Sequence, residues 1–213
     1  MADGQRSEPG GSGVTEHELA QILYGDGVRL RPWTRRDALE QERWPPYGDA
    51  LHSLWNIPRY YSLDNFLPSW SAQRYVWAVD NAQLQMIGRI SLREIDLGQG
   101  HARLGITLGA PYTSRGLGTE ALRVFLDHYF GPLDFRLMKL DVAAFNIRAV
   151  RCYERLGFGH VGEDWRSAGS DPALRLLDDP QLAHLRPFFR RNRHEHQVLF
   201  YEMELIRTGW LGK

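Results

Sequence analysis

Two glycines lie two positions apart in residues 113–122, which read TSRGLGTEAL. The segment follows a strand-like stretch and begins a helical pattern, so we expect Gly116 and Gly118 at a helix N-terminus. Free N–H groups there carry partial positive charge, and glycines let a phosphate approach the backbone with no Cβ in the way. Arg115 could add a charge-assisted hydrogen bond to the same phosphate. The segment therefore predicts a diphosphate site.

Two other interpretations of this segment stay open on its residues alone. The pair of glycines could simply ease close helix packing. Gly116, Gly118 and Ala121 also match the spacing of the dinucleotide-binding fingerprint, which would make the protein a module that binds NAD or a similar nucleotide. That fingerprint requires glycine directly after the first strand of a parallel unit. Here the loop follows strands with short connections, which indicate antiparallel neighbours, so the fingerprint fits less well.

A second segment, residues 146–158, places an amide and a phenol on one side of a helix. Asn146 and Tyr153 are seven residues apart, which is two helical turns, so both side chains share a face. Ala149 lies between them and is small enough to admit a ligand. Gly157 then suits the left-handed position that ends the helix.

These two segments together resemble the GNAT superfamily of acetyl-CoA-dependent N-acetyltransferases, and within it most of all the RimJ/RimL-type branch. In that branch the phosphate loop ends Gly-x-Gly-Thr-Glu-Ala and the later helix reads Asn-x-x-Ala-x-x-x-Tyr-x-x-x-Gly-Phe, and both patterns occur here. The resemblance covers about residues 28–165 and the last strand. It implies an enzyme that uses acetyl-CoA as co-substrate and transfers the acetyl group to a primary amine by direct aminolysis, with backbone N–H groups stabilising the oxyanion.

The resemblance also implies roles for individual residues. The backbone of Ile106 and Leu108 would pair with the pantetheine arm, and Asn146 would hydrogen-bond a pantetheine amide. Tyr153 would be the catalytic residue, donating a hydrogen bond to the sulfur as the thiolate leaves. A phenol with a pKa near 10 is a weak acid for this task, but a donated hydrogen bond still stabilises the developing charge. The expected cofactor-binding residues are Ile106, Leu108, Arg115, Gly116, Leu117, Gly118, Thr119, Asn146, Ala149 and Tyr153.

The sequence departs from the family pattern at two places besides a long insert. Thr113 occupies a position where the loop often has Gln or Arg, and Arg103 occupies one where many members of the branch carry a glutamate. Because Arg103 cannot act as the usual general base, a non-catalytic acyl-CoA-binding regulatory domain of the same fold is an alternative. Other candidate bases, each also readable as an ordinary surface residue, are Glu94, Asp96, His101 and Glu163. No base is assigned.

The pattern of the whole chain predicts a mixed α+β fold, with a mostly antiparallel central sheet flanked by helices. We expect one domain over residues 15–213, a disordered tail over 1–14 and an insert at about 169–194. The cofactor cleft would lie between the third strand of the antiparallel meander and the next strand. Strands are expected at 28–33, 75–80, 86–96, 101–109, 137–145, 158–165 and 197–205, and helices at 15–24, 35–43, 115–130, 147–156 and about 180–189.

Two regions could select the acceptor. The insert carries basic residues that could cover the acceptor site, bind an acidic acceptor or form a homodimer contact; they could equally be a solvated helix face. An aromatic-rich stretch could hold a cationic amine by cation–π contact or could simply pack onto the sheet. The aromatic residues are Trp44, Tyr47, Trp55, Tyr60, Tyr61, Phe66 and Trp70, and the basic residues of the insert are Arg186, Arg190, Arg191 and Arg193.

Composition limits the partners. The 26 basic and 26 acidic residues of the 213-residue chain give a net charge of +0, so we expect no nucleic acid or membrane partner. Cys152 is the single cysteine, and no signal peptide or membrane span is evident, so a cytoplasmic location is expected. His194 and His196 lack a third ligand, so no metal is expected. The acceptor would be a protein or peptide N-terminus, or a small-molecule amine.

Overall fold

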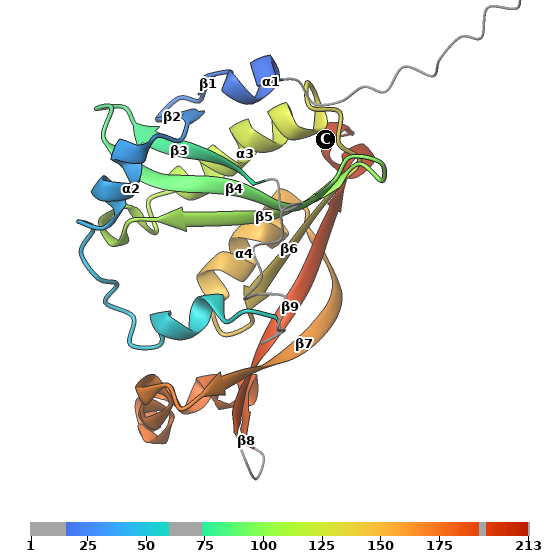
Figure 1. Cartoon of the computed structure of the whole chain (residues 1–213). Helices are drawn as coiled ribbons and strands as arrows, with labels where there is room; N and C mark the ends of the chain where they lie inside the picture. The colour runs from blue at the N-terminus through green and yellow to red at the C-terminus, as the bar shows by residue number, and fades with distance from the viewer. Residues whose placement is uncertain (1–15, 60–73, 192–194, 213) are drawn as a thin grey trace, which may run out of the picture.

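The computed structural model describes residues 16–59, 74–191 and 195–212 (Figure 1). Its centre is a nine-stranded mixed sheet with the order β1-β2-β3-β4-β5-β6-β9-β7, in which β8 pairs with one end of β9. The strands are β1 (Leu23–Tyr24), β2 (Val28–Pro32), β3 (Tyr75–Asn81), β4 (Met86–Asp96), β5 (His101–Leu108), β6 (Leu137–Ala143), β7 (Gly159–Gly169), β8 (Phe189–Arg191) and β9 (His196–Ile206). The α-helices are α1 (Glu16–Ala20), α2 (Arg35–Gln41), α3 (Leu117–Phe130), α4 (Ile147–Leu156) and α5 (Arg207–Leu211).

Side chains alternate between the two faces of the sheet and build a core on each. On one face, the buried side of α3 packs on β3, where the rings of Trp77 and Phe125 are 4.9 Å apart. On the opposite face a second cluster forms under the 3₁₀ helix η1 (His52–Asn56) and includes Leu54 and Phe200. The sheet is therefore covered on both sides, with α3 and α4 on the first face.

Strands β5 and β6 are parallel neighbours for only three residue pairs, from His101↔Leu137 to Arg103↔Lys139. Beyond Arg103 the two strands separate, as Figure 1 shows, while β5 continues to pair with β4 as far as Leu108. A parallel ladder that stops halfway leaves backbone groups of β5 without a strand partner on that side. This split lies where the sequence predicted the cofactor cleft.

The predicted elements from 28 to 165 are all present, with ends shifted by a few residues. The expected helix over 15–24 is wrong in its second half, because it ends at Ala20 and β1 then pairs with β2. Helix α5 was not expected. The predicted tail over 1–14 lies outside the described residues, and the single-domain boundaries stay a prediction.

The insert forms two consecutive 3₁₀ helices, η4 (Pro172–Asp178) and η5 (Pro180–Phe188), followed by β8. A helix near 180–189 was expected, but an α-helix is disfavoured there because Pro187 inside it lacks the N–H that such a helix needs. Phe189 then turns inward beside Phe145, with ring centroids 5.1 Å apart. The insert thus packs onto the second core.

Candidate active site

A cavity of about 270 Å³ opens where β5 and β6 separate. Its walls come from the end of β5, the loop before α3, the inward side of α4, the middle of β6 and the segment around η1. The lining residues are Tyr47, Trp55, Asn56, Ile106, Leu108, Thr113, Ser114, Gly116, Gly118, Thr119, Leu122, Asp141, Val142, Asn146, Arg148, Ala149, Cys152, Tyr153 and Arg155.

The β5 wall presents free backbone groups. Gly109 donates its N–H to Ile87 of β4 at 2.8 Å, and hydrogen bonding alternates along an antiparallel strand. The backbone groups of Leu108 and Ile106 therefore point the other way, into the split. One of them is already used, because the Tyr47 hydroxyl donates to the Leu108 carbonyl. An extended amide-containing ligand would find the N–H groups of both residues available.

The loop wall is shaped by left-handed backbone. Ser114 has φ +60° and Gly116, which caps α3, has φ +82°, a conformation that favours glycine. A Cβ on Gly116 would meet nothing within 4 Å, so this glycine is needed for its backbone angle and faces open space. A Cβ on Gly118 would lie 2.7 Å from the Leu108 side chain, so this second glycine permits close approach of α3 to β5.

Most of the predicted cofactor residues line the cavity. Gly116, Gly118 and Thr119 of the loop do so, but Arg115 and Leu117 do not. Thr119 also links the two helices, because its hydroxyl lies 3.1 Å from the sulfur of Cys152 on α4. Thr119 and Cys152 both line the cavity with small polar side chains. The sequence did not predict Cys152 as a cavity residue.

Helix α4 contributes Asn146, Ala149 and Tyr153 to the cavity, as its spacing predicted. The side chain of Asn146 caps the helix, accepting a hydrogen bond from the Ala149 N–H at 3.3 Å. Burial raises the pKa of Tyr153, and the nearby Cys152 and Asp141 raise it further. The phenol therefore stays protonated at neutral pH and can donate a hydrogen bond.

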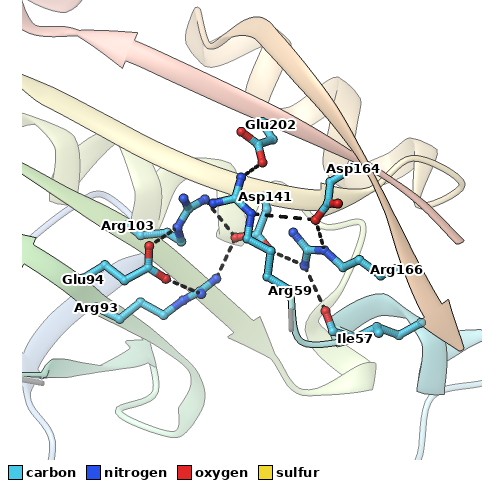
Figure 2. Close-up of polar contacts among 9 residues, drawn as sticks. All are labelled: Ile57, Arg59, Arg93, Glu94, Arg103, Asp141, Asp164, Arg166 and Glu202. Carbon is cyan, nitrogen blue, oxygen red and sulfur yellow. Dashed lines mark hydrogen bonds and ion pairs between the residues drawn. The ribbon is translucent and has the colours of Figure 1, made fainter. Parts of the chain in front are cut away.

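Asp141 is the only carboxylate that lines the cavity among the residues that the structure describes, and sequence reasoning missed it. It alternates on β6 with Leu140 and Val142, which belong to the first core, so its side chain lies on the opposite face of the sheet. Figure 2 shows three arginines around it: Arg166 at 2.7 Å, Arg93 at 2.8 Å and Arg103 at 3.2 Å. Burial alone would raise the pKa of Asp141, but these guanidinium groups together lower it.

The candidate bases from the sequence do not line the cavity within the described part of the chain. Glu94 binds Arg93 and Arg103, and Asp96 accepts a backbone N–H in the β4–β5 turn. Glu163 lies on β7 opposite Tyr201, and His101 begins β5 far from the split end. Arg103, at the position where many members of the branch carry a glutamate, is buried and pairs with Glu94 and Asp141.

The aromatic stretch reaches the cavity through Tyr47 and Trp55, whose rings meet edge-on at 5.0 Å. Arg148 already lies 5.4 Å from the Trp55 ring. Trp44 instead packs on Gly109, where a Cβ would lie 3.1 Å from its ring. The predicted wall residues Tyr60, Tyr61, Phe66 and Trp70 lie outside the described residues.

The described ranges contain neither a candidate metal site nor a candidate membrane span. No cluster of three or more His, Cys, Asp or Glu side chains that could hold a metal occurs there, although His194 lies outside them. No helix in these ranges is both long and apolar enough to span a lipid bilayer.

Comparison with known proteins agrees with this architecture. The family model described as "Acetyltransferase (GNAT) domain" matches residues 28–159. The chain belongs to the GNAT acetyltransferase family. The predicted GNAT fold, the enzyme class and acetyl-CoA as co-substrate are confirmed at this level.

Relatives of this GNAT chain include acetyltransferases named for small amines. A spermidine N(1)-acetyltransferase of Vibrio cholerae is 30% identical over 92 residues, which cover 42% of this chain and 53% of that enzyme. The chain thus matches about half the length of that relative. An aminoglycoside N(6')-acetyltransferase type 1 of Klebsiella pneumoniae is 25% identical over 185 residues, covering 79% of this chain and 81% of the relative.

The fold is shared with solved structures. A spermidine N-acetyltransferase from Vibrio cholerae, solved in complex with CoA and spermine, superposes with a TM-score of 0.58. The match covers 88% of this chain and 99% of that one at 21% identity, which shows a common fold.

The walls of the cavity fit acetyl-CoA. The free N–H groups of Ile106 and Leu108 suit the amides of a pantetheine arm, and the start of α3 suits a diphosphate. Arg148 and Arg155 line the same cavity and could meet phosphate charge. When bound, the co-substrate would supply a thioester whose acyl carbon is open to attack by an amine.

Proposed function

We propose that this GNAT enzyme transfers the acetyl group of acetyl-CoA to a primary amine of a small molecule. The observation that carries the proposal is the cavity at the β5–β6 split. Groups suited to the cofactor come from β5, α3 and α4, while Asp141 enters the cavity from the opposite face. The acceptor would approach from the face that the cofactor leaves free.

Two kinds of acceptor are supported by the relatives. Relatives with similar sequences are named for spermidine and for aminoglycosides, which are both small molecules with several amino groups. A protein N-terminus, which the RimJ/RimL-type resemblance implied, stays a prediction as the alternative acceptor. A homodimer also stays a prediction. The panel of acceptors in the experiment below therefore includes all three classes.

In the proposed mechanism Asn146 and the start of α3 hold the cofactor, and the Tyr153 hydroxyl donates to the departing sulfur. Because arginines hold the pKa of Asp141 below its usual range, this carboxylate is a poor base for an ammonium group. The amine would lose its proton to water before attack. An α-amine near pKa 8 needs less help than a lysine-type amine near 10.4.

The experiment is a steady-state acetylation assay on the full chain with spermidine, an aminoglycoside and a peptide with a free N-terminus. We expect turnover with at least one small amine. Tyr153→Phe should lower kcat by about a hundredfold while CoA affinity changes little, since the phenol acts on the leaving group. If CoA binds but no amine is acetylated, the protein is instead a regulatory acyl-CoA-binding domain and the proposal is wrong.

A further inference from the structure

Beside the cavity, on the sheet face opposite α3 and α4, four arginines and four carboxylates form one ion-pair cluster (Figure 2). It spans β4, β5, β6, β9 and β7, and Asp141 joins it to the cavity. The arginines are Arg59, Arg93, Arg103 and Arg166, and the carboxylates are Glu94, Asp141, Asp164 and Glu202.

Every carboxylate of this cluster already binds at least one arginine. Asp164 accepts from Arg166 at 3.0 Å, and Glu202 pairs with Arg59. A polyamine entering here would have to displace guanidinium groups that are held by geometry and burial. The aromatic wall is also unsuited to a polyamine, because the Arg148 guanidinium already lies over the ring of Trp55, where the cation would bind.

The guanidinium groups, in contrast, have hydrogen-bonding capacity to spare. Arg166 is 3% exposed and binds Asp141, Asp164 and the Ile57 carbonyl, yet its Nη2 has no hydrogen-bond partner in the described part of the chain. The side chain of Arg103 is 8% exposed and binds Glu94 through Nε and Asp141 through Nη1. Its Nη2 has no partner among the described residues. A buried donor left without an acceptor is costly, so Arg166 Nη2 favours an incoming acceptor group, and the unused Nη2 of Arg103 adds a second donor.

Charge does not oppose an anion. The four arginines and four carboxylates balance, so the cluster has no excess of negative charge that would repel a carboxylate. A guanidinium group offers paired N–H donors that match a carboxylate. Arg103 and Arg166 both bind Asp141, so their spare donors lie beside the one carboxylate that reaches the reaction cavity.

We propose that the acceptor is an amine that also carries a carboxylate group, bound by the spare N–H donors of Arg103 and Arg166. This inference rests on the proposed function and narrows its substrate class. The carboxylate would be held on the cluster side of the split, and the amine would reach the thioester past Asp141. Polyamines without a carboxylate would be poorer substrates.

The test compares amines that differ only by one carboxylate. The pairs are L-ornithine with putrescine, L-lysine with cadaverine and 4-aminobutyrate with propylamine, with spermidine as the polycation. For at least one pair we expect the carboxylate-bearing member to have a kcat/KM about ten- to a hundredfold higher, as expected for a hydrogen-bonded charge pair. Arg103→Gln should reduce this ratio to nearly one without changing KM for acetyl-CoA.

Arg207→Gln is the control, because Arg207 pairs with Asp134 at the surface, outside the cavity and the cluster. It should keep the wild-type ratio. Should Arg103→Gln fail to fold, inhibition of the wild type decides: butyrate should compete with the amine and butyramide should not.

The outcomes distinguish failure of this inference from failure of the proposed function. If amines are acetylated but carboxylates bring no advantage, or the advantage survives Arg103→Gln, the inference is overturned and the proposed function stands. Absence of inhibition by butyrate would likewise overturn it. If no amine is acetylated, both fall together.

Discussion

Asn146 holds two roles at the start of α4, and two substitutions should separate them. Its side-chain oxygen caps the helix by accepting from the Ala149 N–H, and its amide nitrogen has no partner among the described residues. Because the side chain lines the cavity, that nitrogen is free to donate to a cofactor amide. Aspartate keeps the capping oxygen and loses the donor, whereas alanine loses both.

The magnitudes follow from these contacts. Loss of the cap in Asn146→Ala should cost about 1 kcal/mol, which lowers Tm by about 2–4 °C in a chain of this size. Asn146→Asp should leave Tm within about 1 °C, since aspartate is as good a cap and its charge suits a helix N-terminus. Both variants should bind CoA about two- to twelvefold more weakly, the effect of one hydrogen bond.

The assay combines thermal unfolding of the free protein with calorimetric titration of CoA. Equal losses of Tm in both variants would refute the capping argument. Unchanged CoA affinity in both would refute the assignment of the amide nitrogen to the cofactor.

Two further predictions concern protons. Because burial raises the pKa of Tyr153, its hydroxyl should keep its proton over the assayed pH range and should not cause a fall in rate at alkaline pH. Tyr153→Phe should therefore lower kcat equally from pH 6 to about pH 10. An alkaline limb that vanishes in the variant would contradict this. Asp37 is the second case. Although burial raises its pKa, hydrogen bonds from Arg31 and Thr34 lower it from 3.8 to about 2. A lowered folded-state pKa contributes stability above about pH 4 that is lost as pH falls towards 2, so Asp37→Asn should be about 2 kcal/mol less stable at pH 7 by urea unfolding, and a deficit that persists at pH 2 would refute this source.

Local patterns in the sequence were enough to predict the elements that line the candidate cofactor cavity. The glycines of the loop and the Asn146–Tyr153 spacing depend on backbone geometry and helical period, which neighbouring residues determine. Those residues accordingly line the cavity. The pairing of β1 with β2 was missed because a two-residue strand leaves no periodic signal.

The acceptor side could not be predicted in the same way. Asp141 reads as one polar residue in an alternating strand, and Arg166 as one of many surface arginines. Their importance arises only when β4, β5, β6, β9 and β7 are laid side by side. Arg103 did stand out in the sequence as a departure from the family pattern, but its two contacts depend on partners that lie 9 and 38 residues away.

The central claim is that the loop before α3 forms the acetyl-CoA site, and a thermal melt with acetyl-CoA, CoA and NAD tests it most directly. The variants are Gly116→Trp and Gly169→Trp. Both glycines have positive φ, at +82° and +57°, and open space around a Cβ, but only Gly116 lines the cavity. Both substitutions should therefore cause similar backbone strain.

Acetyl-CoA at 100 times its Kd should stabilise the wild type by about 2.7 kcal/mol, a rise in Tm of about 5–10 °C. We expect the same rise in Gly169→Trp and none in Gly116→Trp, with no effect of NAD on any of the three. A rise that persists in Gly116→Trp, or stabilisation by NAD in place of acetyl-CoA, would contradict the account.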